Sequence, residues 1–180
     1  MRELFHVWPS TLADDQVGRI IKAGLVRTAS DATLFSSAEA LEGIRSCTVR
    51  WMDDEWVRAL LWGYVLEANE RGFQVAVDGR CEMQLTEYRA ESGDHYGWHH
   101  DVHWNGQAPV DRKLSVTVQL TDPERYEGGA FEFDEVKTTA DLRAKGTVLV
   151  FPSYLRHRIQ PVTSGTRRAL VAWFSGPRWA

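Results

Sequence analysis

The chain has 180 residues, of which 43% are hydrophobic and 26% are charged, and its formal net charge at pH 7 is −4. A chain of this length predicts one domain with a sizeable core. The slight negative charge argues against a nucleic-acid partner, because such proteins present a basic surface to phosphate groups. No stretch approaches the ~20 apolar residues of a membrane span, so we expect no membrane partner either.

The cysteines and the first residues favour a cytoplasmic protein. The two cysteines, Cys47 and Cys81, are too few for a disulfide scaffold, and we expect both to be free, buried thiols. Residues 1–6 lack the long apolar run of a signal peptide. We therefore predict a cytoplasmic location.

The first 72 residues carry two helical patterns. Apolar residues at helical spacing predict a first helix over residues 10–25, with Ser10 as its N-cap. Residues 28–46 are small and polar and predict an irregular connection, and residues 47–51 predict a short strand. A second helix is predicted over residues 53–72, where the apolar residues again follow the helical period.

Beyond residue 72 the apolar period changes to two residues. Phe73, Val75 and Val77 alternate with smaller or polar residues and predict a strand, which the Asp78-Gly79 turn would join to the next strand as a hairpin. Further strands are predicted at hairpin-like intervals over residues 83–88, 114–120, 131–133, 147–151 and 169–174. Two helices followed by a run of strands predict a mainly β fold, with helices packed on an antiparallel sandwich or barrel.

A short motif in the middle of the chain has the spacing of metal ligands. His99 and Asp101 are two residues apart, so on an extended strand both side chains point to the same face, whereas His100 points away. His157, just beyond the apolar stretch 147–151, is a candidate third ligand. Two histidines and one carboxylate form the facial triad of non-haem Fe(II) oxygenases, but zinc accepts similar donors. Each histidine could also have a purely structural role.

Arg167 follows His157 by ten residues and is a candidate ligand for an anion. Residues 161–165 have the composition of a turn, and antiparallel pairing beyond it would bring Arg167 level with His157. A guanidinium grips a carboxylate through two parallel hydrogen bonds, which suits the distal end of a dicarboxylate whose other end chelates iron. Alternatively, Arg167 and Arg168 form an exposed basic pair that caps the turn.

Several segments in the same order resemble one enzyme family. They are Tyr88 and residues 96–101, 112–120, 126–133, 146–152 and 157–173. Over most of residues 45–175 the chain resembles the 2-oxoglutarate- and Fe(II)-dependent dioxygenases, in the prolyl 4-hydroxylase-type branch that includes the bacterial PKHD-type hydroxylases. The resemblance implies a double-stranded β-helix (a jelly-roll, cupin-like core) supported by amino-terminal helices. We expect one such domain over residues 1–180, with helical support over about 1–72 and the β core over about 73–176.

The resemblance also assigns roles to residues. It implies that His99, Asp101 and His157 bind Fe(II) and are catalytic, and that Arg167 binds the 5-carboxylate of 2-oxoglutarate with help from Tyr88. Related enzymes can use a Ser or Thr two residues after the arginine, but the residue in this chain is Ala169, so Tyr88 or Thr117 would have to supply a hydroxyl. Gly128-Gly129 is expected to form a tight turn before the strand at 131–133.

The reaction that the resemblance implies is hydroxylation of a C–H carbon, with O2 consumed and 2-oxoglutarate decarboxylated to succinate and CO2. Ascorbate would be an additional reductant. The expected substrate is a prolyl or other residue of a peptide or protein, although a small molecule is an alternative. Trp98, Trp104 and Tyr154 could form an aromatic surface for such a chain, and residues 102–111 could form a mobile loop that closes over it.

Two other functions use the same residues. A zinc-dependent hydrolase would combine Asp101 with His99, His100 or His103 and a metal-bound water, but it leaves Arg167 without a role. A non-catalytic jelly-roll module would retain the metal ligands for structural reasons and would not bind 2-oxoglutarate.

Overall fold

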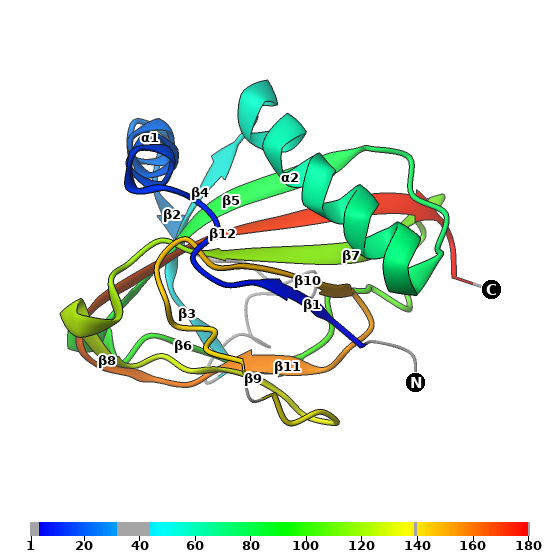
Figure 1. Cartoon of the computed structure of the whole chain (residues 1–180). Helices are drawn as coiled ribbons and strands as arrows, with labels where there is room; N and C mark the ends of the chain where they lie inside the picture. Colours follow the sequence, from blue (N-terminus) through cyan, green and yellow to red (C-terminus); the bar gives the residue numbers. More distant parts are fainter. Residues whose placement is uncertain (1–3, 32–43, 139, 180) are drawn as a thin grey trace.

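The computed structural model describes residues 4–31, 44–138 and 140–179 of the chain. Two α-helices lie on one side of a large antiparallel sheet, and a small antiparallel sheet lies on the other side (Figure 1). None of the described helices is long and apolar enough to cross a membrane. Both cysteines are free, as predicted, but only Cys47 is buried, whereas Cys81 is partly exposed.

The first helix, α1 (Asp14–Leu25), begins later than predicted. Its N-cap is Ala13, whose backbone N–H donates to the Gln16 side chain at 3.0 Å. Ser10 is not the cap: it has a φ of +46°. The segment before the helix is held elsewhere, because the Ser10 N–H donates to the Thr147 hydroxyl at 3.1 Å. This tertiary contact replaces the local cap that the sequence predicts.

The second helix, α2 (Glu55–Ala68), begins after the N-cap Asp54, as predicted, but continues into a π-helical turn, η2 (Asn69–Phe73). Residues 74–80 form no strand, so the strand predicted from Phe73, Val75 and Val77 is wrong. Their alternation reflects packing, because all three are partly buried against the main core. The Asn69 side chain fixes this segment through paired hydrogen bonds of 2.9 Å with the Val75 backbone.

The predicted hairpin at Asp78-Gly79 is also wrong. Gly79 does turn the chain with a φ of +76°. However, the backbone of the turn is hydrogen-bonded to Ser175, near the carboxyl end of β12 (Val162–Pro177). The Asp78 N–H donates to the Ser175 carbonyl, and the Ser175 N–H donates to the Arg80 carbonyl, each at 3.0 Å.

The large sheet contains eight strands within the described ranges. In spatial order these are β1 (His6–Trp8), β10 (Val148–Pro152), β7 (Val110–Gln119), β12 (Val162–Pro177), β5 (Cys81–Arg89), β4 (Thr48–Met52) and β2 (Ser30–Asp31), with β8 (Tyr126–Gly128) paired to β12. The strands predicted over 47–51, 83–88, 114–120, 147–151 and 169–174 are confirmed, although β7 begins four residues and β12 seven residues earlier than predicted. Their pairing differs from the hairpins expected, since neighbours in the sheet are distant in sequence.

The small sheet consists of four strands in the part of the chain that the structure describes. They are β3 (Arg45–Ser46), β6 (His95–His99), β11 (His157–Ile159) and β9 (Phe131–Phe133), in that order. Short 3₁₀ turns, η3 (Ala90–Ser92) and η4 (Pro123–Arg125), connect neighbouring elements. Strands β2 and β3 lie within the predicted irregular connection 28–46, of which 32–43 falls outside the described residues. The amino-terminal region therefore contributes strands to both sheets as well as helices.

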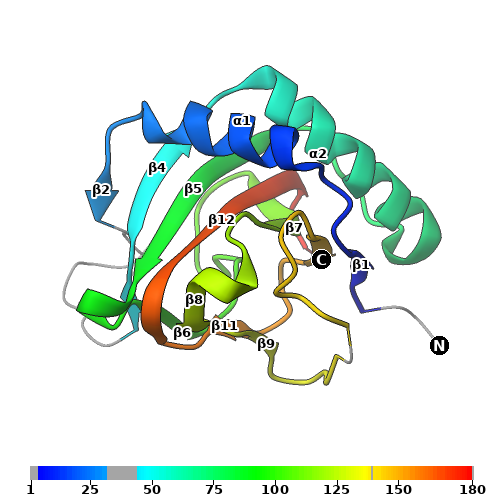
Figure 2. The same cartoon turned by 60° about the vertical axis from the view of Figure 1, so that its left-hand side comes forward.

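The two faces of the large sheet differ in polarity. The face under the helices is apolar: Leu85, Val118 and Leu170 are fully buried in one cluster with Leu61 and Val65 of α2. In both views the helices cover only this face (Figures 1 and 2). The opposite face turns toward the small sheet and carries buried polar side chains, namely Gln84, Thr86, Ser115 and Arg167. The fold therefore places a cavity between the sheets, with several buried polar side chains in its lining.

The apolar face should dominate the stability of the fold. Leu170 pairs in register with Leu85 and Val118, and its side chain has no exposed surface. We expect Leu170→Ala to lower the free energy of unfolding by about 2–5 kcal/mol, because it leaves a cavity in a packed core. Chemical denaturation measures this change. The control is Leu66→Ala, on the exposed side of α2 with 46% of its surface accessible, which should change stability by about 0.5 kcal/mol.

Candidate active site

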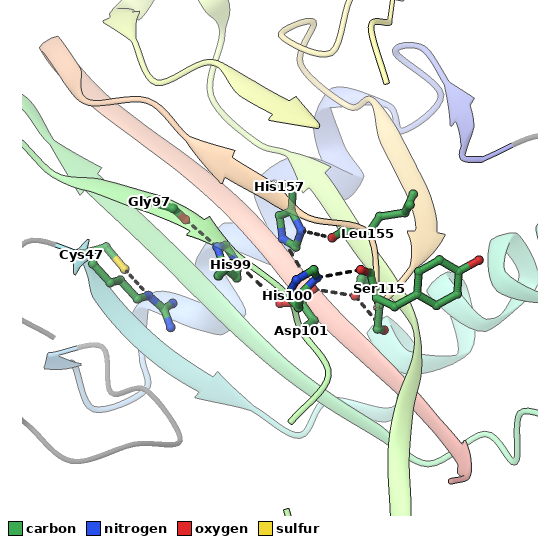
Figure 3. A network of polar contacts seen from close by, with 11 residues as sticks. Cys47, Gly97, His99, His100, Asp101, Ser115, Leu155 and His157 are labelled. Atoms are coloured by element: carbon green, nitrogen blue, oxygen red, sulfur yellow. Dashed lines mark hydrogen bonds and ion pairs between the residues drawn. The ribbon is translucent and has the colours of Figure 1, made fainter. Parts of the chain in front are cut away.

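Three side chains converge between the sheets: His99 from β6, His157 from β11, and Asp101 from the segment that follows β6. His99 and His157 are paired in register, and Asp101 follows β6 by two residues. One ligand atom from each residue lies within 4.8 Å of the others. The Asp101 Oδ1 atom is 3.6 Å from His99 Nε2, and its Oδ2 atom is 3.6 Å from His157 Nε2 (Figure 3). The structure thus brings together the three residues predicted as metal ligands.

Backbone carbonyls set the orientation of both imidazoles. His99 Nδ1 donates to the Gly97 carbonyl at 2.8 Å, and His157 Nδ1 donates to the Leu155 carbonyl at 2.9 Å (Figure 3). Because a carbonyl only accepts, each ring carries its proton on Nδ1 and directs the Nε2 lone pair toward Asp101. This arrangement is usual for metal-binding histidines.

Burial and mutual proximity fix the charges of the group. Burial lowers the pKa of His157 to about 4, and the neighbouring His99 acts in the same direction. Burial alone would raise the pKa of Asp101, but the adjacent His157 and His99 hold it below its usual range. At neutral pH the group therefore presents an ionised carboxylate and a neutral His157 imidazole. Such a donor set suits a divalent cation.

A pair of serine hydroxyls supports the carboxylate. Ser115 donates from Oγ to Asp101 Oδ2 at 2.6 Å, and Ser153 Oγ lies 2.9 Å from Ser115 Oγ. Ser153 also accepts the Asp101 backbone N–H through its carbonyl at 2.9 Å. Asp101 lies outside the regular strand, so these contacts replace the sheet in fixing its position.

Aromatic rings pack around the histidines. Tyr96 stacks on His99 with ring centres 3.4 Å apart and planes 6° from parallel. Phe131 stacks on His157 at 5.3 Å, and Phe151 meets the same ring edge-on at 4.8 Å. These contacts restrict both imidazoles to one rotamer and shield that side of the group from water.

A cavity extends from the triad between the two sheets. Its lining consists of His99, Asp101 and His157 together with Arg45, Gln84, Thr86, Tyr88, Tyr96, Thr117, Phe131, Ile159, Arg167, Ala169, Val171 and Trp173. Tyr88, Thr117 and Ala169, which the sequence singles out, are all in this lining. Three buried polar atoms of the lining have no hydrogen-bond partner among the described residues, namely Gln84 Oε1, Arg167 Nη1 and Trp173 Nε1. A bound polar molecule would satisfy them.

Arg167 reaches the cavity by a different route from the one predicted. Residues 161–165 do not fold β12 back on β11, because these strands belong to different sheets and β12 begins at Val162. Arg167 pairs in register with Tyr88 of β5, and its guanidinium carbon lies 5.5 Å from the Tyr88 ring centre. With only 3% of its surface exposed, Arg167 is not half of an exposed basic pair. Arg168 points to the opposite face and pairs with Glu87 at 2.6 Å.

Gly128 and Gly129 form the predicted turn before β9, with φ values of +72° and +60°. Gly129 also makes room for the arginine, because a Cβ atom there would lie 2.9 Å from Arg167 Cδ and 3.0 Å from Val162 Cγ2. The glycine is therefore required by the site as well as by the turn.

The remaining candidate residues lie outside the cavity. His100 is exposed and donates from Nδ1 to the Tyr154 carbonyl at 2.7 Å, so it points away from the triad as predicted. His100 and His103 are not part of the potential metal group found among the described residues. Trp98 lies under the Arg158 guanidinium, at 4.6 Å, and Trp104 is 52% exposed. None of these residues lines the cavity.

The sequence analysis did not identify several residues that line the cavity or support Asp101. Gln84 and Thr86 alternate with apolar residues on β5, and this polar alternation was an available signal. Ser115 lies in a predicted strand, but its contact with Asp101 is a tertiary one. Arg45 gave no sequence signal because it lies in a stretch predicted to be irregular.

The support of Asp101 by Ser115 can be tested with Mn(II) as a probe. We expect Ser115→Ala to weaken Mn(II) binding about tenfold, because the carboxylate loses the donor that orients it. Ser153→Ala is the matched control: it removes a neighbouring hydroxyl but leaves the Ser115–Asp101 bond, so its effect should be smaller. Titration followed by electron paramagnetic resonance of free Mn(II) measures both. Equal effects of the two changes would contradict a specific role for Ser115.

Comparisons with known proteins agree with this geometry. Residues 83–175 match the family model of the 2OG-Fe(II) oxygenase superfamily. A PKHD-type hydroxylase of Hyphomonas neptunium is 40% identical over 84 residues, which cover 45% of this chain and 38% of the relative. A PKHD-type hydroxylase of Crocosphaera subtropica is 34% identical over 115 residues, which cover 61% and 51% of the two chains. The chain thus matches about half or less of the length of these relatives.

Solved structures show the same fold. A viral collagen prolyl hydroxylase from Paramecium bursaria Chlorella virus-1 superimposes with a TM-score of 0.72 at 19% identity, covering 97% of both chains. A Pseudomonas putida prolyl-4-hydroxylase gives a TM-score of 0.73 at 21% identity, covering 97% of this chain and 93% of the other. These likenesses confirm the predicted double-stranded β-helix. The chain belongs to the 2OG-Fe(II) oxygenase superfamily, and its resemblance to the prolyl 4-hydroxylase-type branch is confirmed.

Proposed function

We propose that the protein is a dioxygenase that uses Fe(II) and 2-oxoglutarate to hydroxylate a C–H carbon, in a prolyl or other residue of a peptide or protein. The observation that carries the proposal is the cavity shared by two features. One is the triad of His99, Asp101 and His157, and the other is the buried, unpaired Nη1 of Arg167. A metal site and a carboxylate-binding group facing one cavity are what a chelating dicarboxylate requires.

The triad would hold Fe(II) through two imidazole nitrogens and a carboxylate oxygen. All three residues line the cavity, which would therefore receive the cosubstrate next to the ion. When bound, Fe(II) supplies the redox chemistry that uses O2 to convert 2-oxoglutarate to succinate and CO2 and to insert one oxygen atom into a C–H bond. Ascorbate is proposed as an external reductant.

The residues of the chain bind and orient the cosubstrate. Arg167 offers a two-pronged grip on the distal carboxylate. Burial raises the pKa of the Tyr88 hydroxyl, so it stays protonated and can donate to the same carboxylate. Thr117, on the neighbouring strand β7, lines the cavity and provides a further hydroxyl in place of the one absent at Ala169.

A groove next to the triad is the proposed substrate path. Asp101 lines this groove as well as the cavity, together with Arg112, His103 and residues 106–108. The segment 102–109 contains neither helix nor strand, so one wall of the groove is a loop, although residues 110 and 111 of the predicted loop belong to β7. We propose that this loop closes over the substrate. A similar solved structure, a prolyl hydroxylase from Trichoplax adhaerens, is described in complex with a hypoxia inducible factor peptide, which supports a peptide substrate.

The two rival functions fit the site less well. A zinc hydrolase that uses His100 or His103 as a metal ligand does not fit, because neither residue belongs to the group of described residues that could hold a metal ion. It also leaves the buried Arg167 without a purpose. A non-catalytic module explains neither the unpaired Nη1 of Arg167 nor the other unpaired polar atoms of the lining, Gln84 Oε1 and Trp173 Nε1.

The decisive experiment is an anaerobic titration with Fe(II) and then 2-oxoglutarate. We expect the visible absorption band that arises when Fe(II) and a 2-oxo acid are bound together. His157→Ala should remove the band, because one of the three ligands is lost. Absence of the band from folded wild-type protein that has bound iron would contradict the proposal and favour the zinc enzyme or the binding module.

The role of Arg167 has a matched control in the next residue. Arg167→Gln should raise the dissociation constant for 2-oxoglutarate about 10- to 100-fold, because a hydrogen-bonded charge pair is lost. Arg168→Gln removes the same charge from the opposite face of β12 and should leave this constant nearly unchanged. Isothermal titration calorimetry of Mn(II)-loaded protein measures both. Equal losses would indicate a general effect of charge or of folding instead.

A further inference from the structure

A second arginine lines the cosubstrate cavity. Arg45 belongs to β3, at the edge of the small sheet, and its side chain forms part of the lining that contains Arg167 and the triad. It is partly buried, and no described carboxylate pairs with it. Other arginines near the site differ in this respect, since Arg168 pairs with Glu87 and Arg158 pairs with Glu132.

Two contacts hold the Arg45 side chain in place. Its Nε donates to the Cys47 thiol at 3.2 Å (Figure 3), and its guanidinium carbon lies 4.4 Å above the centre of the Tyr96 ring. Neither contact supplies a carboxylate, and burial raises the pKa of the Cys47 thiol. The guanidinium is thus oriented by its neighbours but not neutralised.

Tyr88 places the two arginines at the same part of the cavity. Arg167 is adjacent to Tyr88 in the sheet register, and its guanidinium lies against the Tyr88 ring. Arg45 contacts Cys47, which shares one packed cluster with Tyr88 and Val49. Both guanidiniums therefore line the cavity close to Tyr88, and no ion pair joins either of them to a carboxylate of the described residues.

A carboxylate has room for more than one arginine. Its two oxygens offer about four lone-pair positions, and a two-pronged contact with one guanidinium uses two of them. Two cations beside one small cavity repel each other and have lost part of their hydration. A bound anion would relieve both penalties.

We propose that Arg45 is a second binding residue for the distal carboxylate of 2-oxoglutarate, acting with Arg167 and Tyr88. The inference rests on the proposed function, because it concerns the same cosubstrate. It makes the cavity selective for a 2-oxo acid with a second carboxylate. The competing explanation is structural: Arg45 would only support Tyr96, which in turn stacks on His99.

Binding of two related acids to the Mn(II)-loaded protein of residues 1–180 separates these explanations. The probes are 2-oxoglutarate and 2-oxopentanoate, which has the same chelating end but lacks the distal carboxylate. We expect Arg45→Gln to weaken 2-oxoglutarate binding about 10- to 100-fold and to leave 2-oxopentanoate binding unchanged. Mn(II) affinity without either acid should also be unchanged. Arg45→Lys keeps the charge without the two-pronged geometry, and we expect an intermediate loss.

The matched control is Arg89→Gln. Arg89 follows Tyr88 directly but points to the opposite face of β5, where it pairs with Glu87, so the same charge is lost outside the cavity. Its affinity for both acids should match that of the wild type. Thermal unfolding of each variant establishes that it is folded before titration.

Each outcome decides between the explanations. Unchanged 2-oxoglutarate affinity in Arg45→Gln would overturn the inference. Equal weakening of both acids, or a loss of Mn(II) affinity, would also overturn it, because the residue would then support the metal site through Tyr96. Wild-type protein that binds Mn(II) but not 2-oxoglutarate would instead reject the proposed function itself.

Discussion

Antiparallel pairing between β6 and β11 is the interaction on which the site depends. It places His99 directly opposite His157, so that two residues separated by most of the β core lie on neighbouring strands with their rings 4.2 Å apart. Asp101 must lie beyond the end of β6 to complete the triad, and there it has no sheet partner. Its backbone and carboxylate are held by Ser153 and Ser115 instead. The strand pairing supplies two of the proposed metal ligands, and the serines fix the position of the third.

The large sheet makes this arrangement compatible with a stable fold. Residues along one strand alternate between faces, so β5 can direct Leu85 to the helices and Gln84 and Thr86 to the cavity. Strand β12 does the same with Leu170 and Arg167. The helices cover the apolar face and complete a core most of whose buried residues come from the strands, while the opposite face lines the cavity. Changes in the cavity lining therefore need not disturb the packing under the helices.

The sequence predicted His99 and Asp101 as a pair because they are only two residues apart, although Asp101 lies beyond the end of β6 and is positioned by Ser115 and Ser153. His157 is distant in sequence and joins them only through the pairing of β11 with β6. Arg167 was predicted at the site for the wrong reason, since it enters from a different sheet and not from a turn after β11. Errors in the fold share one cause, which is tertiary contact. Ser10 is held by Thr147 instead of capping a helix, and Val75 is held by Asn69 in an irregular segment despite its strand-like alternation. Ser115 and Arg45 became visible only when distant strands were placed side by side.

The polar atoms without partners show how binding and stability are connected. Arg167 Nη1, Gln84 Oε1 and Trp173 Nε1 are buried and unsatisfied among the described residues, and all belong to one cavity. Buried polar groups that form no hydrogen bond lower the stability of the folded state, because they lose their hydration. A ligand that satisfies them recovers this free energy only in the folded state, so its binding also stabilises the fold. In the proposed complex the same groups would favour a cosubstrate whose carboxylate pairs with the buried Arg167 guanidinium over molecules that cannot make this contact.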